Sequence, residues 1–117
     1  MKKIYHLSTC DTCQRIIKDL RPLDEFELQD IKSEAITESQ VEEMKSLTGT
    51  YEALFSKRAR LYREKGLNEK QLSETDFKNL ILEHYTFLKR PVIFVDGKIF
   101  VGNSKKVVEA AKQAIHS

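Results

Sequence analysis

Two cysteines, Cys10 and Cys13, stand three residues apart near the start of the chain. A short β-prone run ends just before them, and apolar residues recur at helical spacing just after them, which places the pair where a helix begins. The unpaired N–H groups and partial positive charge of a helix N-terminus favour a thiolate over a thiol. One helical turn also brings the two positions close enough for a disulfide. We expect Cys10, which is nearer the free amides, to be the nucleophile and Cys13 to be the resolving thiol.

The same pair could also be half of a zinc site or a structural disulfide. Tetrahedral zinc needs four ligands, but the chain has no second cysteine pair, and His6, His84 and His116 stand at no recognised spacing. A disulfide across so short a loop constrains little of the unfolded chain. A Cys-x-x-Cys motif beside a strand and a helix, in a reducing compartment, is typical of redox chemistry. We therefore expect a dithiol and no bound metal.

The hydrophobic pattern around that turn predicts an α/β protein. Capping boxes at 37–40 and 73–76 start two helices, and Asp96-Gly97 is a type I′ hairpin signal between two apolar runs. The expected elements, in chain order, are a strand at 4–7, a helix through 20, a strand at 26–29, helices at 37–48, 51–65 and 73–88, strands at 92–95 and 99–101, and a last helix capped by Asn103 or Ser104.

Three blocks of the sequence resemble the arsenate reductase (ArsC) family, which also contains the Spx-type regulators. They are IYHLSTCDTCQR at 4–15, LFSKRARLYREKGL at 54–67 and LKRPVIFVDGKIFVG at 88–102. The resemblance implies a thioredoxin-like (glutaredoxin-like) mixed sheet with a helical insertion at about 37–89, all in a single domain, 1–117. The Cys-x-x-Cys itself is more similar to the Spx and reductase-like branches, since many arsenate reductases keep only the first cysteine.

The resemblance also implies roles for residues outside the motif. His6 lies four residues before Cys10, as in the family's Tyr-His-x-x-x-Cys pattern, where a cationic or hydrogen-bonding imidazole would favour the thiolate. Pro91 matches the cis proline that packs against the redox cysteine in thioredoxin-like folds. Arg90 would point at the Cys10 thiolate or a bound oxyanion, and Arg58 matches an arginine of the reductase-like and Spx-type branches. From residue type alone, a packed histidine and solvated arginines are the more usual interpretation.

Two of the three arginines with which arsenate reductases of this family hold the oxyanion are missing. Ser56 stands in place of the first and Asn103 in place of the third, while Arg90 keeps the second. Serine and asparagine cannot form the bidentate charged contacts that suit a tetrahedral anion, although Arg58 and Lys105 would replace part of the charge. These departures predict weak arsenate reduction. The expected substrate-binding residues are Arg58, Arg90, Pro91, Asn103 and Lys105.

Two classes of function remain open. The first is a thiol-disulfide oxidoreductase resembling arsenate reductase, with no bound cofactor and with thioredoxin, glutaredoxin or glutathione as electron donor. The second is a redox-sensing regulator resembling Spx, in which a Cys10–Cys13 disulfide changes binding to RNA polymerase. His6 favours the enzyme, whereas the Cys-x-x-Cys and the missing arginines fit either class.

Length and composition set further limits. The chain has 117 residues, of which 40% are hydrophobic and 32% charged, and these values suit one globular domain. A net charge of +2 does not argue for direct binding to nucleic acid or membrane. No apolar run approaches the roughly 20 residues of a membrane helix, and the start of the chain lacks the apolar region of a signal peptide. We expect a cytoplasmic monomer.

Overall fold

The computed structural model describes residues 1–117 and divides into two compact units. One unit comprises Met1–Ala35 and Arg90–Ser117, and the other comprises Ile36–Lys89. The second unit spans almost the same residues as the helical insertion expected at about 37–89. No helix in either unit is long and apolar enough to cross a membrane.

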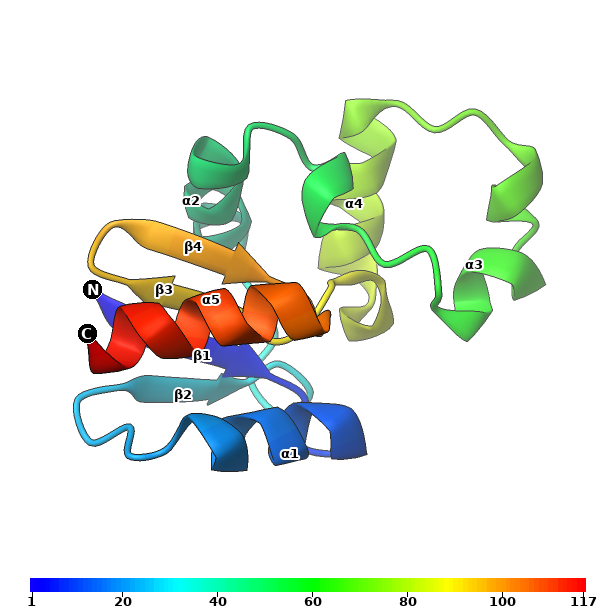
Figure 1. Ribbon diagram of the computed structural model, residues 1–117. Coiled ribbons are helices and arrows are strands. Elements are labelled where there is room, and N and C mark those ends of the chain that lie inside the picture. The colour runs from blue at the N-terminus through cyan, green and yellow to red at the C-terminus, as the bar shows by residue number, and fades with distance from the viewer. The chain divides into compact units, whose positions relative to one another are not determined.

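The first unit contains a four-stranded mixed sheet with strand order β2-β1-β3-β4 (Figure 1). Strand β1 runs parallel to β2 and antiparallel to β3, and β3 and β4 form an antiparallel hairpin. This is the expected thioredoxin-like fold, with α1 as the crossover between the two parallel strands. Its elements are β1 Lys2–His6, α1 Asp11–Leu20, β2 Glu27–Asp30, β3 Val92–Val95, β4 Lys98–Val101 and α5 Lys105–His116.

Helices α1 and α5 pack against one face of this sheet. The register places Ile4 of β1 opposite Ile93 of β3, so both side chains lie on the same face. They join apolar residues of the two helices in one buried cluster of Ile4, Ile16, Ile17, Leu20, Leu23, Ile93, Val95 and Ala111. Full burial of such a side chain contributes about 1.5–3 kcal/mol, so this cluster fixes α1, and with it the cysteine motif, on the sheet.

The turn between β3 and β4 has the predicted type I′ character. Asp96 has φ 47° and Gly97 has φ 87°, and this turn type requires positive φ at both central residues. The turn fixes the register of the hairpin, in which Val92 pairs with Val101. The first residue of β3 therefore lies beside the last residue of β4, where the chain leaves the sheet for α5.

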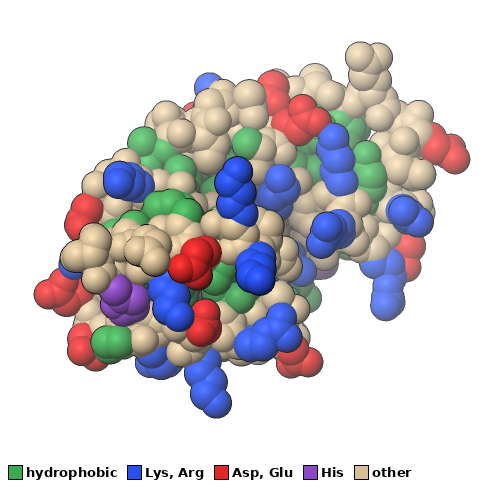
Figure 2. Space-filling model, in the orientation of Figure 1, with side chains coloured by type: hydrophobic (Ala, Val, Ile, Leu, Met, Phe, Trp, Pro, Cys, Tyr) green, Lys and Arg blue, Asp and Glu red, His purple; other side chains and the backbone are tan.

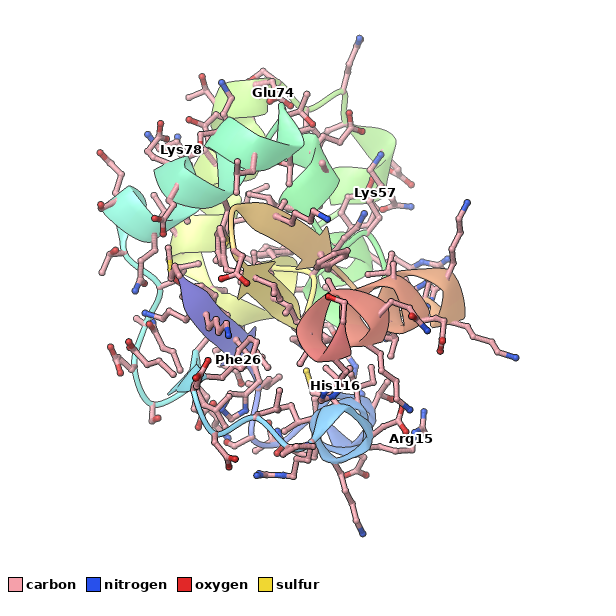
Figure 3. All side chains as sticks on the ribbon, turned by 60° about the vertical axis from the view of Figure 1, so that its left-hand side comes forward. Arg15, Phe26, Lys57, Glu74, Lys78 and His116 are labelled. Atoms are coloured by element: carbon pink, nitrogen blue, oxygen red, sulfur yellow. The ribbon has the colours of Figure 1, made fainter.

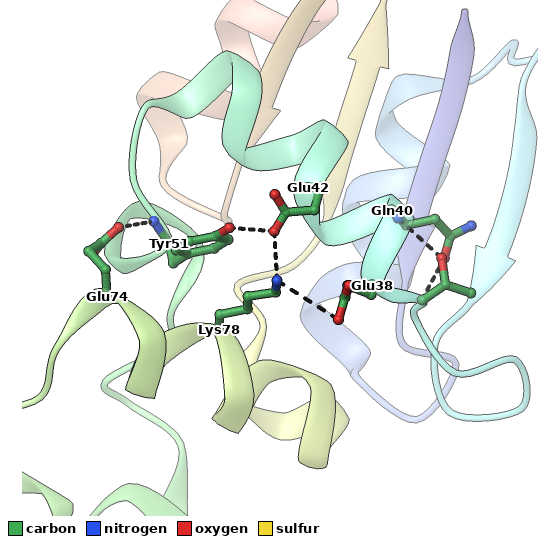
Figure 4. Close-up of polar contacts among 7 residues, drawn as sticks. Glu38, Gln40, Glu42, Tyr51, Glu74 and Lys78 are labelled. Atoms are coloured by element: carbon green, nitrogen blue, oxygen red, sulfur yellow. Dashed lines mark hydrogen bonds and ion pairs between the residues drawn. The ribbon is translucent and has the colours of Figure 1, made fainter.

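The second unit is helical, and both predicted capping boxes are present. Thr37 begins α2 and Ser73 begins α4, each in reciprocal hydrogen bonds with the residue three positions later (Figure 4 shows the first). Gly49 ends α2, as predicted. The α-helices of this unit are α2 Glu38–Thr48, α3 Arg60–Glu64 and α4 Glu74–Glu83, with 3-10 helices at Glu52–Leu54, Leu67–Glu69 and Tyr85–Phe87.

The predicted continuous helix at 51–65 is wrong. The chain leaves the 3-10 helix at Leu54 and starts α3 only at Arg60. Between them Phe55 pairs with Leu88, and the Ser56 N–H donates to the Phe87 carbonyl at 2.8 Å. These long-range backbone bonds take the donors that a helix would have used, so tertiary structure overrides the local preference here.

The predicted helix at 73–88 is too long. Helix α4 ends at Glu83, because His84 adopts an extended conformation with φ −150°. The Nδ1 atom of His84 then accepts the Thr86 N–H at 3.0 Å and caps the following 3-10 helix. Phe87 and Leu88 are fully buried all the same, although they lie outside the helix.

Polar contacts join α2 and α4 within the second unit (Figure 4). The Tyr51 hydroxyl donates to the Glu42 carboxylate, which also forms an ion pair of 3.1 Å with Lys78. The backbone N–H of Tyr51 donates to Glu74 at 2.7 Å. Lys78 contacts Glu38 at 3.8 Å as well, so one lysine on α4 bridges two carboxylates on α2.

Candidate redox site

The turn that leads from β1 into α1 places both cysteines. β1 ends at His6 and α1 begins at Asp11, with Cys10 as its N-cap residue in extended conformation. The Cys10 N–H donates to the Leu7 carbonyl at 3.0 Å, and the Cys10 carbonyl accepts the first bond of the helix, from the Gln14 N–H at 3.1 Å. The Cys10 side chain itself forms no capping hydrogen bond. The Cys10 sulfur therefore lies at the N-terminus of α1 and accepts no capping hydrogen bond from the backbone N–H groups there.

The two cysteines are free thiols in very different surroundings. Cys10 is partly exposed, whereas only 1% of Cys13 is exposed. Burial raises the pKa of the Cys13 thiol to about 11, and a hydrogen bond with Cys10 acts in the same direction. A backbone hydrogen bond from Leu7 and the charge of Arg90 oppose this rise. Cys13 is thus held as a protonated thiol next to the partly exposed Cys10.

The start of β3, which directly follows Arg90 and Pro91 in the chain, and the start of α5 lie at the same end of the first unit as the start of α1 (Figure 1). The Arg90–Pro91 peptide bond is cis, as the family resemblance implies, and Pro91 is buried at the start of β3. Arg90 is half-buried, and its charge acts on Cys13. A second cis bond, Arg21–Pro22, lies just beyond the C-terminus of α1 and was not predicted.

Asn103 and Lys105 are brought to this end of the sheet by the β3–β4 hairpin. The Gly102 N–H donates a hydrogen bond to the carbonyl of the cis proline, Pro91, at 3.0 Å. Asn103 is the next residue after Gly102. Ser104 is the N-cap of α5, and Lys105 is the first helical residue. Both Asn103 and Lys105 are exposed. Their proposed contact with substrate stays a prediction.

Arg58 belongs to the second unit, where it is exposed in the turn before α3. Two basic neighbours are engaged in ion pairs: Lys57 with Glu52 at 2.7 Å and Lys65 with Glu83 at 3.1 Å. Arg58 forms no ion pair in the structure. Lysines and arginines are otherwise interspersed with acidic residues on the face seen in Figure 2. The role of Arg58 in binding substrate stays a prediction.

His6 ends β1, and its side chain bonds α1. Its Nδ1 atom lies 3.1 Å from the side-chain nitrogen of Gln14, which also donates to the Leu7 carbonyl at 3.0 Å. Burial lowers the pKa of His6, and the nearby charge of Asp30 opposes this. The structure has no hydrogen bond between His6 and either cysteine, so the expected influence of the imidazole on Cys10 stays a prediction.

Asp30 is a residue of the site that the sequence did not suggest. It ends β2 and pairs in register with His6. Its carboxylate accepts the N–H groups of Ser8 at 3.1 Å and Lys32 at 3.2 Å, and it bonds the hydroxyl of Ser33 at 3.2 Å. Hydrogen bonds with Ser8, first of all, lower the pKa of Asp30 to about 2. The carboxylate thus holds the turn that precedes Cys10.

A usable signal for Asp30 was present in the pattern. Parallel strands end at the same edge of a sheet, so residues that follow β1 and residues at the end of β2 must meet. Gln14 carried no such signal, since a polar residue on the exposed side of a helix normally points to solvent. Arg15, the next residue of α1, is exposed and its side chain projects away from the helix (Figure 3).

The comparison with known proteins identifies the family of this chain. Residues 5–111 match the model of the ArsC family. The chain belongs to the ArsC family. No group of three or more histidine, cysteine, aspartate or glutamate side chains is arranged to hold a metal ion in this member of the family.

Relatives of this ArsC-family chain carry names of both functional classes. An uncharacterised protein from Haemophilus influenzae is 27% identical and is matched over 95% of this chain and 98% of its own. A Bacillus cereus protein named global transcriptional regulator Spx 2 is 24% identical over 90% of this chain and 82% of its own. The crystal structure of a possible arsenate reductase from Streptococcus mutans superimposes with a TM-score of 0.74 at 27% identity, covering 95% of this chain and 97% of that one.

We predict that the two cysteines differ strongly in reactivity. At pH 7.5, iodoacetamide should label Cys10, while Cys13 should react on the order of a hundredfold more slowly than a free thiol, because a pKa of about 11 leaves very little thiolate. Timed labelling followed by peptide mapping measures both rates. Labelling Cys10→Ser in urea and in buffer is the control, since only the unfolded chain should expose a fast Cys13. Equal rates in the native protein would contradict the assignment.

We also predict that Asp30 makes stability depend on acidic pH. A carboxylate with a lowered pKa stabilises the folded state above its ordinary pKa of 3.8, and this contribution is lost as the pH falls towards about 2. Asp30→Asn should therefore lower the thermal midpoint by about 2–5 °C at pH 7 and by progressively less below pH 4. Asp24→Asn, at an exposed position of the same unit, is the matched control. A pH-independent difference would rule out the carboxylate charge as the cause.

Proposed function

We propose that this protein is a thiol-disulfide oxidoreductase in which Cys10 is the nucleophile and Cys13 the resolving thiol. The observation that carries this proposal is the contrast between the two sulfurs. Cys10 is accessible at the N-terminus of α1, and Cys13 is buried and held as a thiol against it. Membership of the ArsC family and the likeness to a possible arsenate reductase support the same class of chemistry.

The reaction proceeds in two exchange steps. The Cys10 thiolate attacks one sulfur of an oxidised substrate, the substrate disulfide breaks, and the leaving thiolate takes a proton from solvent. Cys13 then gives up its proton and attacks the Cys10 sulfur, which forms the Cys10–Cys13 disulfide and releases the second substrate thiol. The substrate gains two electrons and the cysteine pair loses two. An external thiol donor of the thioredoxin, glutaredoxin or glutathione kind restores the dithiol by the reverse exchange.

The high pKa of Cys13 suits a resolving role. A protonated thiol does not compete with Cys10 for the substrate, because only the thiolate is nucleophilic. Its hydrogen bond with Cys10 keeps the two sulfurs together, so the second step is intramolecular and needs no diffusion. Arg90, whose charge acts on Cys13, would favour the thiolate that forms during that step.

Trapping the intermediate tests this scheme. With glutathione disulfide, Cys13→Ser should accumulate one glutathione on Cys10, because the adduct cannot be resolved. Cys10→Ser should form no adduct and should lose at least a hundredfold in disulfide exchange. Mass spectrometry of the intact protein and of its peptides gives the site and stoichiometry. An adduct on Cys13 in the Cys10→Ser variant, formed at the wild-type rate, would reverse the roles.

Arsenate is a weaker candidate substrate. Asn103 follows Gly102, which is hydrogen-bonded to Pro91, and the family resemblance places an arginine at the position of Asn103. A charge-assisted contact from an arginine to an oxyanion contributes about 1.5–3 kcal/mol. Wild-type protein should therefore reduce arsenate poorly, and Asn103→Arg should raise kcat/KM by about 10- to 100-fold. Gln113→Arg adds the same charge at the far end of α5 and should not. Efficient arsenate turnover by the wild type would contradict this expectation.

The alternative is a redox regulator, and the Bacillus cereus relative named as an Spx-type regulator favours it. In that case the Cys10–Cys13 disulfide would change binding to RNA polymerase instead of turning over a substrate. Binding of purified RNA polymerase to the reduced and the oxidised protein separates the two. Redox-dependent binding together with exchange no faster than that of free cysteine would replace the enzyme by the regulator.

A further inference from the structure

The side chain of Gln14 connects α1 to the end of β1. Gln14 directly follows Cys13, at an exposed position of the helix. Its amide nitrogen lies 3.0 Å from the Leu7 carbonyl oxygen and 3.1 Å from His6 Nδ1. One NH₂ group therefore faces two partners on the segment that leads to Cys10.

The Leu7 carbonyl fixes which end of the Gln14 amide faces β1. A carbonyl oxygen can only accept, so it requires the nitrogen end of the amide and excludes the oxygen end. The NH₂ group carries a second hydrogen, and this one faces His6 Nδ1. Nδ1 must then be the ring nitrogen with the lone pair, which leaves the proton of a neutral imidazole on Nε2.

The same contact disfavours the charged imidazole. An imidazolium carries hydrogens on both nitrogens, so its Nδ1–H would point at an N–H of Gln14 with no acceptor between them. The charged group that faces His6 from the neighbouring strand is Asp30, which would favour the cation. That carboxylate is already engaged by Ser8, Lys32 and Ser33. Burial of the ring acts against the cation, in the same direction as Gln14.

We propose that Gln14 is a positioning residue that holds His6 as a neutral imidazole with its proton on Nε2. The ring then carries a single N–H, on Nε2, with a fixed protonation state around neutral pH, at the end of the strand that leads to Cys10. The ring carries no positive charge, and its Nδ1 atom is occupied by the Gln14 N–H and does not act as a base. The effect on exchange through Cys10 rests on the proposed function, whereas the state of the ring does not.

The ring state is measured by ¹⁵N NMR of the histidine side chains across a pH titration. In the wild type, His6 Nδ1 should behave as an unprotonated ring nitrogen at neutral pH, and the ring should become charged only below the ordinary value of 6.5. Gln14→Glu replaces the donor by an acceptor, so the proton should move to Nδ1 and the ring should become charged at higher pH. Arg15→Gln changes the charge of the next residue of α1 by the same amount and should leave the ring state unchanged.

The same variants separate this proposal from the proposed function. Gln14→Leu should lose the tautomer preference and slow disulfide exchange through Cys10 by about five- to tenfold, the effect expected for one misplaced hydrogen bond. In Gln14→Glu, the rate of disulfide exchange should change with pH over the same range in which the His6 ring titrates. A merely structural role of Gln14 would not produce this coincidence. A wild-type His6 that carries its proton on Nδ1, or is charged at neutral pH, would overturn the proposal. Absence of exchange in the wild type, with the expected ring state, would instead overturn the proposed function.

Discussion

The short turn between β1 and α1 is the constraint on which this structure depends. Four residues connect the end of β1 to the first turn of α1. The backbone N–H and C=O groups of so short a turn need hydrogen-bond partners. The Leu7 carbonyl receives the Cys10 N–H and the Gln14 amide, and the Ser8 N–H reaches Asp30 on β2. Because β2, α1 and the turn itself all contribute, Cys10 is placed by the fold of the unit and not by its motif alone.

That placement gives two cysteines of one motif different chemistry. The sequence separates them only by their order along the helix, but the structure buries Cys13 while the N-cap position leaves Cys10 partly exposed. Desolvation of a thiol disfavours its charged form, whereas the free N–H groups at a helix start favour it. The fold thus separates an accessible thiol from a buried one, and under the proposed function these are the nucleophile and the resolving thiol.

Features set by local sequence were predictable, and features set by long-range pairing were not. Capping boxes at Thr37 and Ser73 and the Asp96-Gly97 turn depend on a few adjacent residues, and all three form as expected. The helix expected at 51–65 fails because Ser56 bonds a backbone carbonyl some thirty residues away in sequence. Hydrophobic periodicity could not detect that bond.

The candidate site divides in the same way. The cysteines are recognisable from the sequence because their residue type is restricted by chemistry, whereas the place of Pro91 beside them is implied by the family resemblance. Asp30 and Gln14 are ordinary polar residues that gain a role only from the strand ends and helix side next to them. Partners of this kind are absent from any motif, since many residue types could satisfy the same backbone groups.

We expect the electrostatics of this end of the unit to suit sulfur chemistry better than oxyanion chemistry. A thiolate is a single charge, and the N-terminus of one helix with Arg90 nearby matches it. A tetrahedral oxyanion spreads its charge over several oxygens and needs several donors in fixed directions, which arginine forks provide. Here Asn103 is neutral, and Lys105 is a flexible point charge on the surface. A neutral His6, as proposed above, would add no positive charge, so we expect the site to stabilise one sulfur better than an arsenate.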